Sequence, residues 1–213
     1  MSEHARERTV SEASPVADVI RRCLDVVVSL MLLLVLSPVW AVLALLVKLS
    51  SPGPVLFRQQ RVGLNGKPFE LLKFRSMRVA AGGPEVTAGG DARITPVGRF
   101  MREWKLDELP QFLNVLRGEM SLVGPRPEVP RYVAYYTPEQ RQVLTVRPGI
   151  TGITQLEYRN EEELLKGRDD VEEYYIQEIM PAKLRLDLQY VQTRTLLRDL
   201  GILVRTVWAV LRR

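Results

Sequence analysis

The chain has 213 residues, 46% of them hydrophobic, and its 30 Lys and Arg residues against 25 Asp and Glu give a net charge of +5. This length suits one ordinary domain, and the positive charge favours an anionic partner: a phosphorylated substrate, phospholipid headgroups or nucleic acid. One cysteine (Cys23) and one histidine (His4) exclude an internal disulfide, a cysteine zinc site and a histidine-based catalytic triad. The chemistry must therefore use carboxylates, lysine, arginine, hydroxyls or a bound hard cation.

The N-terminal part divides into a polar tail and an apolar segment. Residues 1–17 are polar and aperiodic, which predicts disorder. Residues 18–49 contain a run, Val26 to Val47, without a charged residue, which is long enough for a membrane helix. Its Leu and Val residues contribute roughly −4.5 to −9 kcal/mol toward insertion, more than the ~3 kcal/mol that a mid-helix proline costs. A buried helix of a soluble protein is the less favoured alternative.

The topology of this run depends on Ser37-Pro38 at its middle. Basic residues flank it on both sides: Arg21 and Arg22 before it, and Lys48, Arg58 and Arg61 after it. The positive-inside bias therefore pulls both ends toward the cytoplasm, which a straight span cannot satisfy. Pro38 supplies a break, and the Ser37 hydroxyl is placed to bond a carbonyl that Pro38 leaves free. We therefore favour a re-entrant helix over an ordinary kinked span.

Residues 50–213 predict a catalytic domain of α+β type, mostly helical. The stretches "PVLFRQQRVG" and "KPFELLKFRSM" predict a small β-hairpin around Asn65-Gly66, and residues 82–96 predict a Gly-rich loop. Helical patterns begin near Val97, resume after Pro110, which is placed to open a helix, and return from Asp170 to the end.

The last helical pattern, "RTLLRDLGILVRTVWAVLRR", is amphipathic. At about 100° per residue, one face collects apolar side chains: Leu196, Leu197, Leu200, Leu203, Val204, Val207 and Leu211. Arginines collect on the opposite face, and Trp208 lies at the boundary. The pattern fits an interfacial membrane helix and, almost equally, a surface helix packed on the domain core.

Two adjacent acids, Asp107 and Glu108, precede Pro110 in "REWKLDELPQF". The positive end of the following helix favours the ionised form of a carboxylate, which suits a nucleophile or a magnesium ligand. An isolated Asp-Glu pair is more often a capping pair on a solvated surface. Arg102 lies close by in the sequence, and Asp187 is an acid in an apolar helical stretch, either a second metal ligand or the partner of a nearby arginine.

Several basic residues are candidates for binding phosphate. Arg126 in "LVGPRPE" stands between two prolines that fix its backbone, so its guanidinium is presented at low entropic cost. Lys73 and Arg75 share one face if "ELLKFRSM" is extended, and Arg147 precedes the proline of "VRPGITG". Solvated arginines in structural turns are the alternative reading.

Three stretches carry a resemblance to a known family: "GPVLFRQQRVGLNGKPFELLKFRSM", "ITPVGRFMREWKLDELPQFLNVLRGEMSLVGPRPE" and "RPGITGITQ". They resemble the bacterial sugar transferase family, the monotopic polyprenyl-phosphate phosphoglycosyl transferases. The similarity runs from about Arg21 to the C-terminus and includes Ser37-Pro38. Departures are Ile153, where many members carry an aromatic, and "LEYRNEEELLKGRDDVEEYY", which differs from the shorter segment of many relatives and is expected to shape sugar choice.

The resemblance implies transfer of a sugar 1-phosphate from a UDP-sugar to undecaprenyl phosphate, with release of UMP. It implies that Asp107 is the nucleophile that forms a covalent sugar-phosphate ester, that Glu108 assists the lipid phosphate, and that Mg²⁺ (or Mn²⁺) binds near Asp107. It also implies that Arg126 holds the nucleotide, and that Lys73, Arg102 and Asp187 lie near the site.

By the same resemblance the re-entrant helix turns at Ser37-Pro38, and the catalytic domain lies on the cytoplasmic face of the bacterial inner membrane. A homodimer is left open, and no nucleic-acid partner is expected, because the arginines are not interleaved with aromatics. The alternative function is a membrane-anchored adaptor that binds lipid or protein and has a degenerate site.

Overall fold

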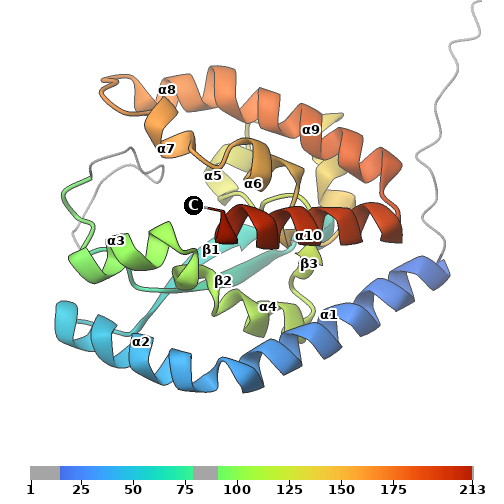
Figure 1. Ribbon diagram of the computed structural model, residues 1–213. Coiled ribbons are helices and arrows are strands. Elements are labelled where there is room, and N and C mark those ends of the chain that lie inside the picture. The colour runs from blue at the N-terminus through green and yellow to red at the C-terminus, as the bar shows by residue number, and fades with distance from the viewer. Residues whose placement is uncertain (1–14, 79–90, 213) are drawn as a thin grey trace, which may run out of the picture.

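The computed structural model describes residues 15–78 and 91–212, and within these ranges the chain is mostly helical with two small sheets (Figure 1). The α-helices are α1 (Pro15–Val35), α2 (Ser37–Ser50), α3 (Pro96–Glu103), α4 (Gln111–Arg117), α5 (Pro130–Val133), α6 (Ile153–Glu157), α7 (Glu161–Leu164), α8 (Val171–Tyr174), α9 (Met180–Thr193) and α10 (Leu196–Leu211). The strands are β1 (Leu56–Val62), β2 (Pro68–Phe74), β3 (Ser121–Val123) and β4 (Gly149–Thr151). The 3₁₀-helices are η1 (Leu64–Gly66), η2 (Leu106–Glu108) and η3 (Gln140–Thr145), and η4 (Tyr175–Ile179) is a π-helix.

These bounds confirm the mostly helical α+β class and the hairpin. Most of the predicted tail (1–17) and of the predicted Gly-rich loop (82–96) lies outside the described residues. Helix α1 already begins at Pro15, three residues before the predicted start of the membrane segment.

Helices α1 and α2 form a bent pair along one edge of the molecule (Figure 1), with a bend of 65° between them. Pro38 has no N–H to give to the carbonyl of Leu34, four residues earlier, and the Ser37 hydroxyl donates to that carbonyl at 2.8 Å. The predicted break and the predicted role of Ser37 are therefore confirmed. Within the described ranges no single helix has both the length and the apolar character to cross a membrane, whereas the bent pair taken together has both.

The two faces of this pair differ. The face toward the domain buries Asp25 and Ser29 of α1 and Leu43 and Val47 of α2. Asp25 accepts a hydrogen bond from the backbone N–H of Leu122 at 2.9 Å, which fixes α1 to β3. The other face leaves apolar side chains exposed, among them Leu24, Val27, Leu30, Met31, Leu34, Val35, Val42, Leu45 and Leu49.

The predicted hairpin is formed by β1 and β2, which pair antiparallel with Gln59 opposite Leu71. Asn65 (φ 55°) and Gly66 (φ 75°) take the left-handed backbone that the turn requires. Apolar side chains of β2 pack in two directions. Phe69 and Leu71 contact the cluster around Val115 and Met120, while Phe74 contacts Leu43, Val47 and Met101. The hairpin thus joins the bent helix pair to α3 and α4.

The second sheet was not predicted. Strands β3 and β4 pair in parallel, with Ser121 opposite Gly149 and Val123 opposite Thr151. Their loops approach so closely that a Cβ on Gly149 would lie 2.1 Å from the backbone nitrogen of Gly124, and a Cβ on Gly152 would lie 2.3 Å from the Gly124 oxygen. Glycine at these positions is therefore what allows the "GPRP" and "PGITG" segments to lie backbone against backbone.

The C-terminal helix combines a packed face and an exposed apolar face. Asp199 and Ile202 of α10 are buried, and Leu203 packs against the cluster of β3 and α9 residues. Several other apolar residues are exposed: Leu197, Leu200, Val204, Val207 and Leu211, with Trp208. One side of α10 therefore packs on the domain, and another side carries exposed apolar residues.

Candidate active site

The acid pair lies in the short turn η2 between α3 and α4. Lys105 takes a left-handed conformation (φ 56°), which ends α3 and reverses the chain. Leu106 and Leu109 on either side of the pair pack into the apolar cluster between α2, β2 and α3. This anchoring leaves Asp107 only 5% exposed. Pro110 is the N-cap residue of α4, as predicted.

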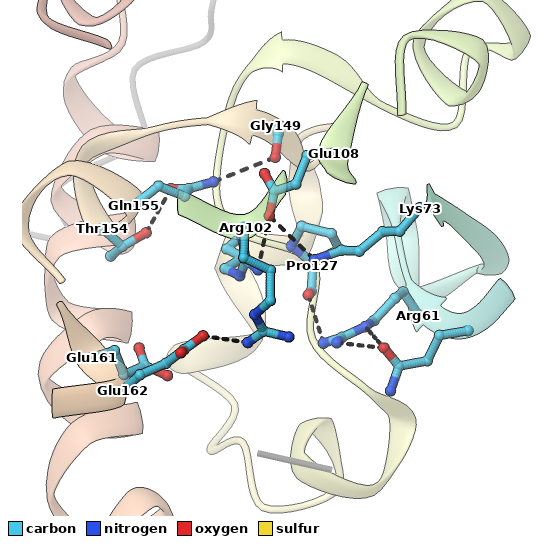
Figure 2. A network of polar contacts seen from close by, with 12 residues as sticks. Arg61, Lys73, Arg102, Glu108, Pro127, Gly149, Thr154, Gln155, Glu161 and Glu162 are labelled. Carbon is cyan, nitrogen blue, oxygen red and sulfur yellow. Dashed lines mark hydrogen bonds and ion pairs between the residues drawn. The ribbon is translucent and has the colours of Figure 1, made fainter. Parts of the chain in front are cut away.

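Glu108 is held by two cations from distant parts of the chain. Its Oε1 lies 3.2 Å from Lys73 Nζ of β2 and 3.4 Å from Arg126 Nη2. Figure 2 shows Lys73 reaching toward Glu108 from the hairpin. Burial works against the ionised form of Glu108, but Lys73 and Arg126 outweigh it and hold the pKa of this carboxyl well below its usual range. Burial in turn lowers the pKa of Lys73, and Glu108 opposes that effect.

Asp107 is in a different state from its neighbour. Burial raises the pKa of Asp107, the nearby charge of Lys73 opposes this, and the negative charge of Glu108 adds to it. No hydrogen bond or ion pair reaches its carboxylate from the residues that the structure describes. Desolvation is therefore the largest influence on Asp107, and the pKa of its carboxyl lies above its usual range.

The loop that carries Arg126 is fixed by polar contacts just after this residue. Arg61 of β1 donates from Nη1 to the Pro127 carbonyl at 3.1 Å and pairs with Glu128 at 2.9 Å. The Tyr175 hydroxyl donates to the other oxygen of Glu128. The segment that follows Arg126 is thus held by part-buried polar contacts, which add to the stiffness that the two prolines give.

Arg102 of α3 lies on another side of the pair. Its Nη2 contacts Oε1 of Glu162 in α7, and its Nη1 lies 3.6 Å from Met77 Sδ. Lys73, Arg102 and Arg126 together place three cations around two carboxylates. Such a set can bind the negative oxygens of a phosphorylated substrate.

Two predicted phosphate ligands are not brought to the acid pair. Strand β2 ends at Phe74, and the buried Arg75 donates instead to the carbonyls of Val47 (3.2 Å), Ser51 (2.7 Å) and Pro54 at the end of α2. Arg147 donates to the Gly118 carbonyl at 2.9 Å, at the end of α4. Both guanidiniums thus donate to carbonyls at or just after the C-terminal end of a helix.

Asp187 is buried in α9 and engaged by Thr154 of α6, whose hydroxyl lies 3.0 Å from its Oδ1. Burial raises the pKa of Asp187 to about 7, a change that Thr154 and Lys183 oppose. In the described part of the chain, no group of three or more His, Cys, Asp or Glu side chains is arranged to hold a metal ion. Asp107 therefore has no assembled set of protein ligands around it.

Asn114 was missed by sequence reasoning, although it connects the parts of the site. It is fully buried, and its Oδ1 accepts from the Leu72 N–H at 3.1 Å. Its Nδ2 donates to the Glu70 carbonyl (2.7 Å) and to Glu119 Oε2 (2.6 Å). It thereby fixes α4, which follows the acid pair, to β2, which carries Lys73. A polar residue among the apolar positions of "QFLNVL" was the available signal.

Carboxylates ringed by lysine and arginine define an enzyme site for phosphorylated substrates. The chain belongs to the bacterial sugar transferase family, whose sequence model matches residues 16–213. This confirms the family predicted from the sequence.

Relatives in several bacteria share most of this chain. A UDP-glucose:undecaprenyl-phosphate glucose-1-phosphate transferase of Caulobacter vibrioides is 44% identical, over 91% of this chain and 70% of its own length. A protein of the same name in Escherichia coli is 40% identical, over 92% of this chain but 41% of its own length. The exopolysaccharide production protein PSS of Rhizobium leguminosarum is 40% identical, over 92% of this chain and 96% of its own length. The chain thus spans less than half of the Escherichia coli relative.

Proposed function

We propose that the protein transfers a sugar 1-phosphate from a UDP-sugar to undecaprenyl phosphate, releasing UMP and forming a diphosphate-linked sugar. One observation carries the proposal: of two adjacent acids, Glu108 is bound to Lys73 and Arg126, whereas the buried Asp107 has no such partner among the described residues. UDP-glucose is the first candidate donor, because two relatives are named for it.

In the first half of the proposed reaction, an Asp107 carboxylate oxygen attacks the phosphorus that bears the sugar. A phosphorus–oxygen bond forms to Asp107 while the bond from this phosphorus to the bridging oxygen of the diphosphate breaks. UMP leaves with that electron pair. Burial makes the Asp107 carboxylate more basic and therefore more nucleophilic, and the absence of a bonded partner leaves its oxygens available.

In the second half, a phosphate oxygen of undecaprenyl phosphate attacks the same phosphorus and displaces Asp107, which becomes a free carboxylate again. The two substrates need not occupy the site together. Because its pKa is held low, Glu108 is a poor proton acceptor. We therefore assign it the task of holding Lys73 and Arg126, whose charges offset those of the phosphates.

Magnesium, or manganese, fits this site as a partner of Asp107 and the donor diphosphate. Mg²⁺ is commonly held by one or two carboxylates together with substrate phosphates, so an assembled protein cage is not required. When bound, it would reduce the repulsion between the diphosphate and the carboxylate. Asp187 is already engaged by Thr154, so we assign the ion to Asp107 alone.

The lipid acceptor requires the site to lie at a membrane. We propose that α1 and α2 enter the bilayer and return on the same side, with the domain on the cytoplasmic face of the inner membrane. The exposed apolar faces of α1, α2 and α10 support this. So do Phe100 of α3 and Trp104, the residue that follows α3, which are half-exposed just before the acid pair.

The test is UMP release from a panel of UDP-sugars by the purified protein with Mg²⁺ and undecaprenyl phosphate. We expect release with one or two sugars, and loss of release in Asp107→Asn, a near-isosteric change whose thermal denaturation should match the wild type. Wild-type release by Asp107→Asn would remove Asp107 as nucleophile. No release by folded, lipid-bound wild type would favour a membrane adaptor instead of an enzyme.

A further inference from the structure

Arg102 pairs with an acid outside the catalytic turn. It lies five residues before Asp107, yet its guanidinium contacts Glu162 of α7 (Figure 2). The side chain of Arg102 is 22% exposed and that of Glu162 is 46% exposed. Solvent therefore reaches this ion pair, chiefly on the side of Glu162, and a dissolved anion can compete for the guanidinium.

Helix α7 does not depend on the Arg102 contact for its place in the fold. Leu165, which follows it, is fully buried in the cluster that contains Tyr132 and Ile179. Glu161, adjacent to Glu162, accepts from Lys183 Nζ at 2.6 Å, and this pair is more buried than that of Arg102. Glu162 can therefore leave Arg102 while α7 stays docked.

We propose that Glu162 belongs to the site that binds the nucleotide sugar. In the free enzyme its carboxylate holds the Arg102 guanidinium, and during the reaction a phosphate of the nucleotide sugar takes the place of that carboxylate. A guanidinium presents the same fork of N–H donors to a carboxylate and to a phosphate, so one can replace the other without moving Arg102 far. A diphosphate carries more charge than one carboxylate and would also face Lys73 and Arg126. The inference rests on the proposed function.

The exchange has a cost that can be measured. The diphosphate must break the Arg102–Glu162 ion pair before it can bind Arg102. A partly exposed ion pair contributes little to the stability of the free enzyme, so removing this pair should tighten binding of a nucleoside diphosphate by about two- to fivefold. The gain should shrink at high salt, because screening weakens the competing pair. If Glu162 instead touched the nucleotide or only stabilised α7, its removal would weaken binding or leave it unchanged.

The experiment is titration calorimetry of UDP with the full chain in detergent and Mg²⁺, because UDP has the diphosphate but no sugar to transfer. The variants are Glu162→Gln, Glu163→Gln, Arg102→Gln and the double variant Arg102→Gln/Glu162→Gln. Glu163 is the matched control: the same charge is removed one residue away, from a side chain that is 65% exposed and pairs with Lys166.

We expect tighter binding in Glu162→Gln alone among the single variants, and no effect of the same change once Arg102 is glutamine. Equal tightening by Glu163→Gln would reduce the effect to net charge and overturn the proposal. Unchanged or weaker binding in Glu162→Gln would also overturn it, as would no binding of UDP to any variant.

These outcomes are distinct from failure of the proposed function. If the wild type binds UDP and releases UMP in the panel assay, the proposed function stands even where the proposal for Glu162 fails.

Discussion

Replacing Asn114 with alanine would remove three hydrogen bonds at a fully buried position. The Leu72 N–H, whose hydrogen bond is buried, the Glu70 carbonyl and the Glu119 carboxylate would each lose this partner. A buried polar group left unsatisfied costs about 1–3 kcal/mol. Counting the two backbone groups at this cost each, we expect the free energy of unfolding to fall by about 2–6 kcal/mol, measured by guanidinium denaturation in detergent.

The same change should also slow UMP release, because Asn114 connects α4 to the strand that carries Lys73. Loosening the 3.2 Å contact between Lys73 and Glu108 misplaces the cations, and we expect at least about a tenfold loss. Glu119→Gln is the control, since its amide oxygen can still accept from Asn114, and stability should change by less than about 1 kcal/mol. If Asn114→Ala stayed within about 0.5 kcal/mol of the wild type with unchanged release, the reasoning would be refuted.

Two further predictions concern Asp187 and Pro38. The pKa of Asp187 is raised to about 7 from 3.8, so between about pH 4 and pH 7 the unfolded chain releases a proton that the folded chain keeps. The stability of the wild type relative to Asp187→Asn should therefore fall across this interval, by up to about 1.4 kcal/mol per pH unit; parallel denaturation profiles would contradict it. Pro38→Ala restores the backbone N–H that residue 38 can donate to the Leu34 carbonyl. It should therefore straighten α1 and α2 toward a full span. Cysteine labelling that still reports both flanks on one side would show that Pro38 does not decide topology.

Local features of the fold could be predicted from the sequence because their causes lie within a few residues. The break at Ser37-Pro38 follows from a missing N–H and a nearby hydroxyl, and the structure has both. The hairpin follows from two β-type stretches around Asn65-Gly66, whose left-handed conformations the structure also has. These patterns need no knowledge of distant parts of the chain.

Contacts between distant segments could not be predicted in the same way. Strand alternation put Lys73 and Arg75 on one face, but β2 ends before Arg75, which turns to the carbonyls at the end of α2. Strands β3 and β4 have three residues each, too few to show a period, and glycines brought together from two loops determine their contact. The sequence pattern therefore predicts neither the contacts of Arg75 nor the pairing of β3 with β4.

The unequal states of Asp107 and Glu108 are the clearest case of this limit. The two acids are neighbours in one turn, so local sequence gives no reason for their pKa values to move in opposite directions. The difference comes from Lys73, 35 residues before Glu108, and Arg126, 18 residues after it. Both cations arrive only when the hairpin, α4 and the glycine-packed loops are in register. It follows that substitutions at Asn114, outside the site, should alter the chemistry of the pair as surely as substitutions of the cations themselves.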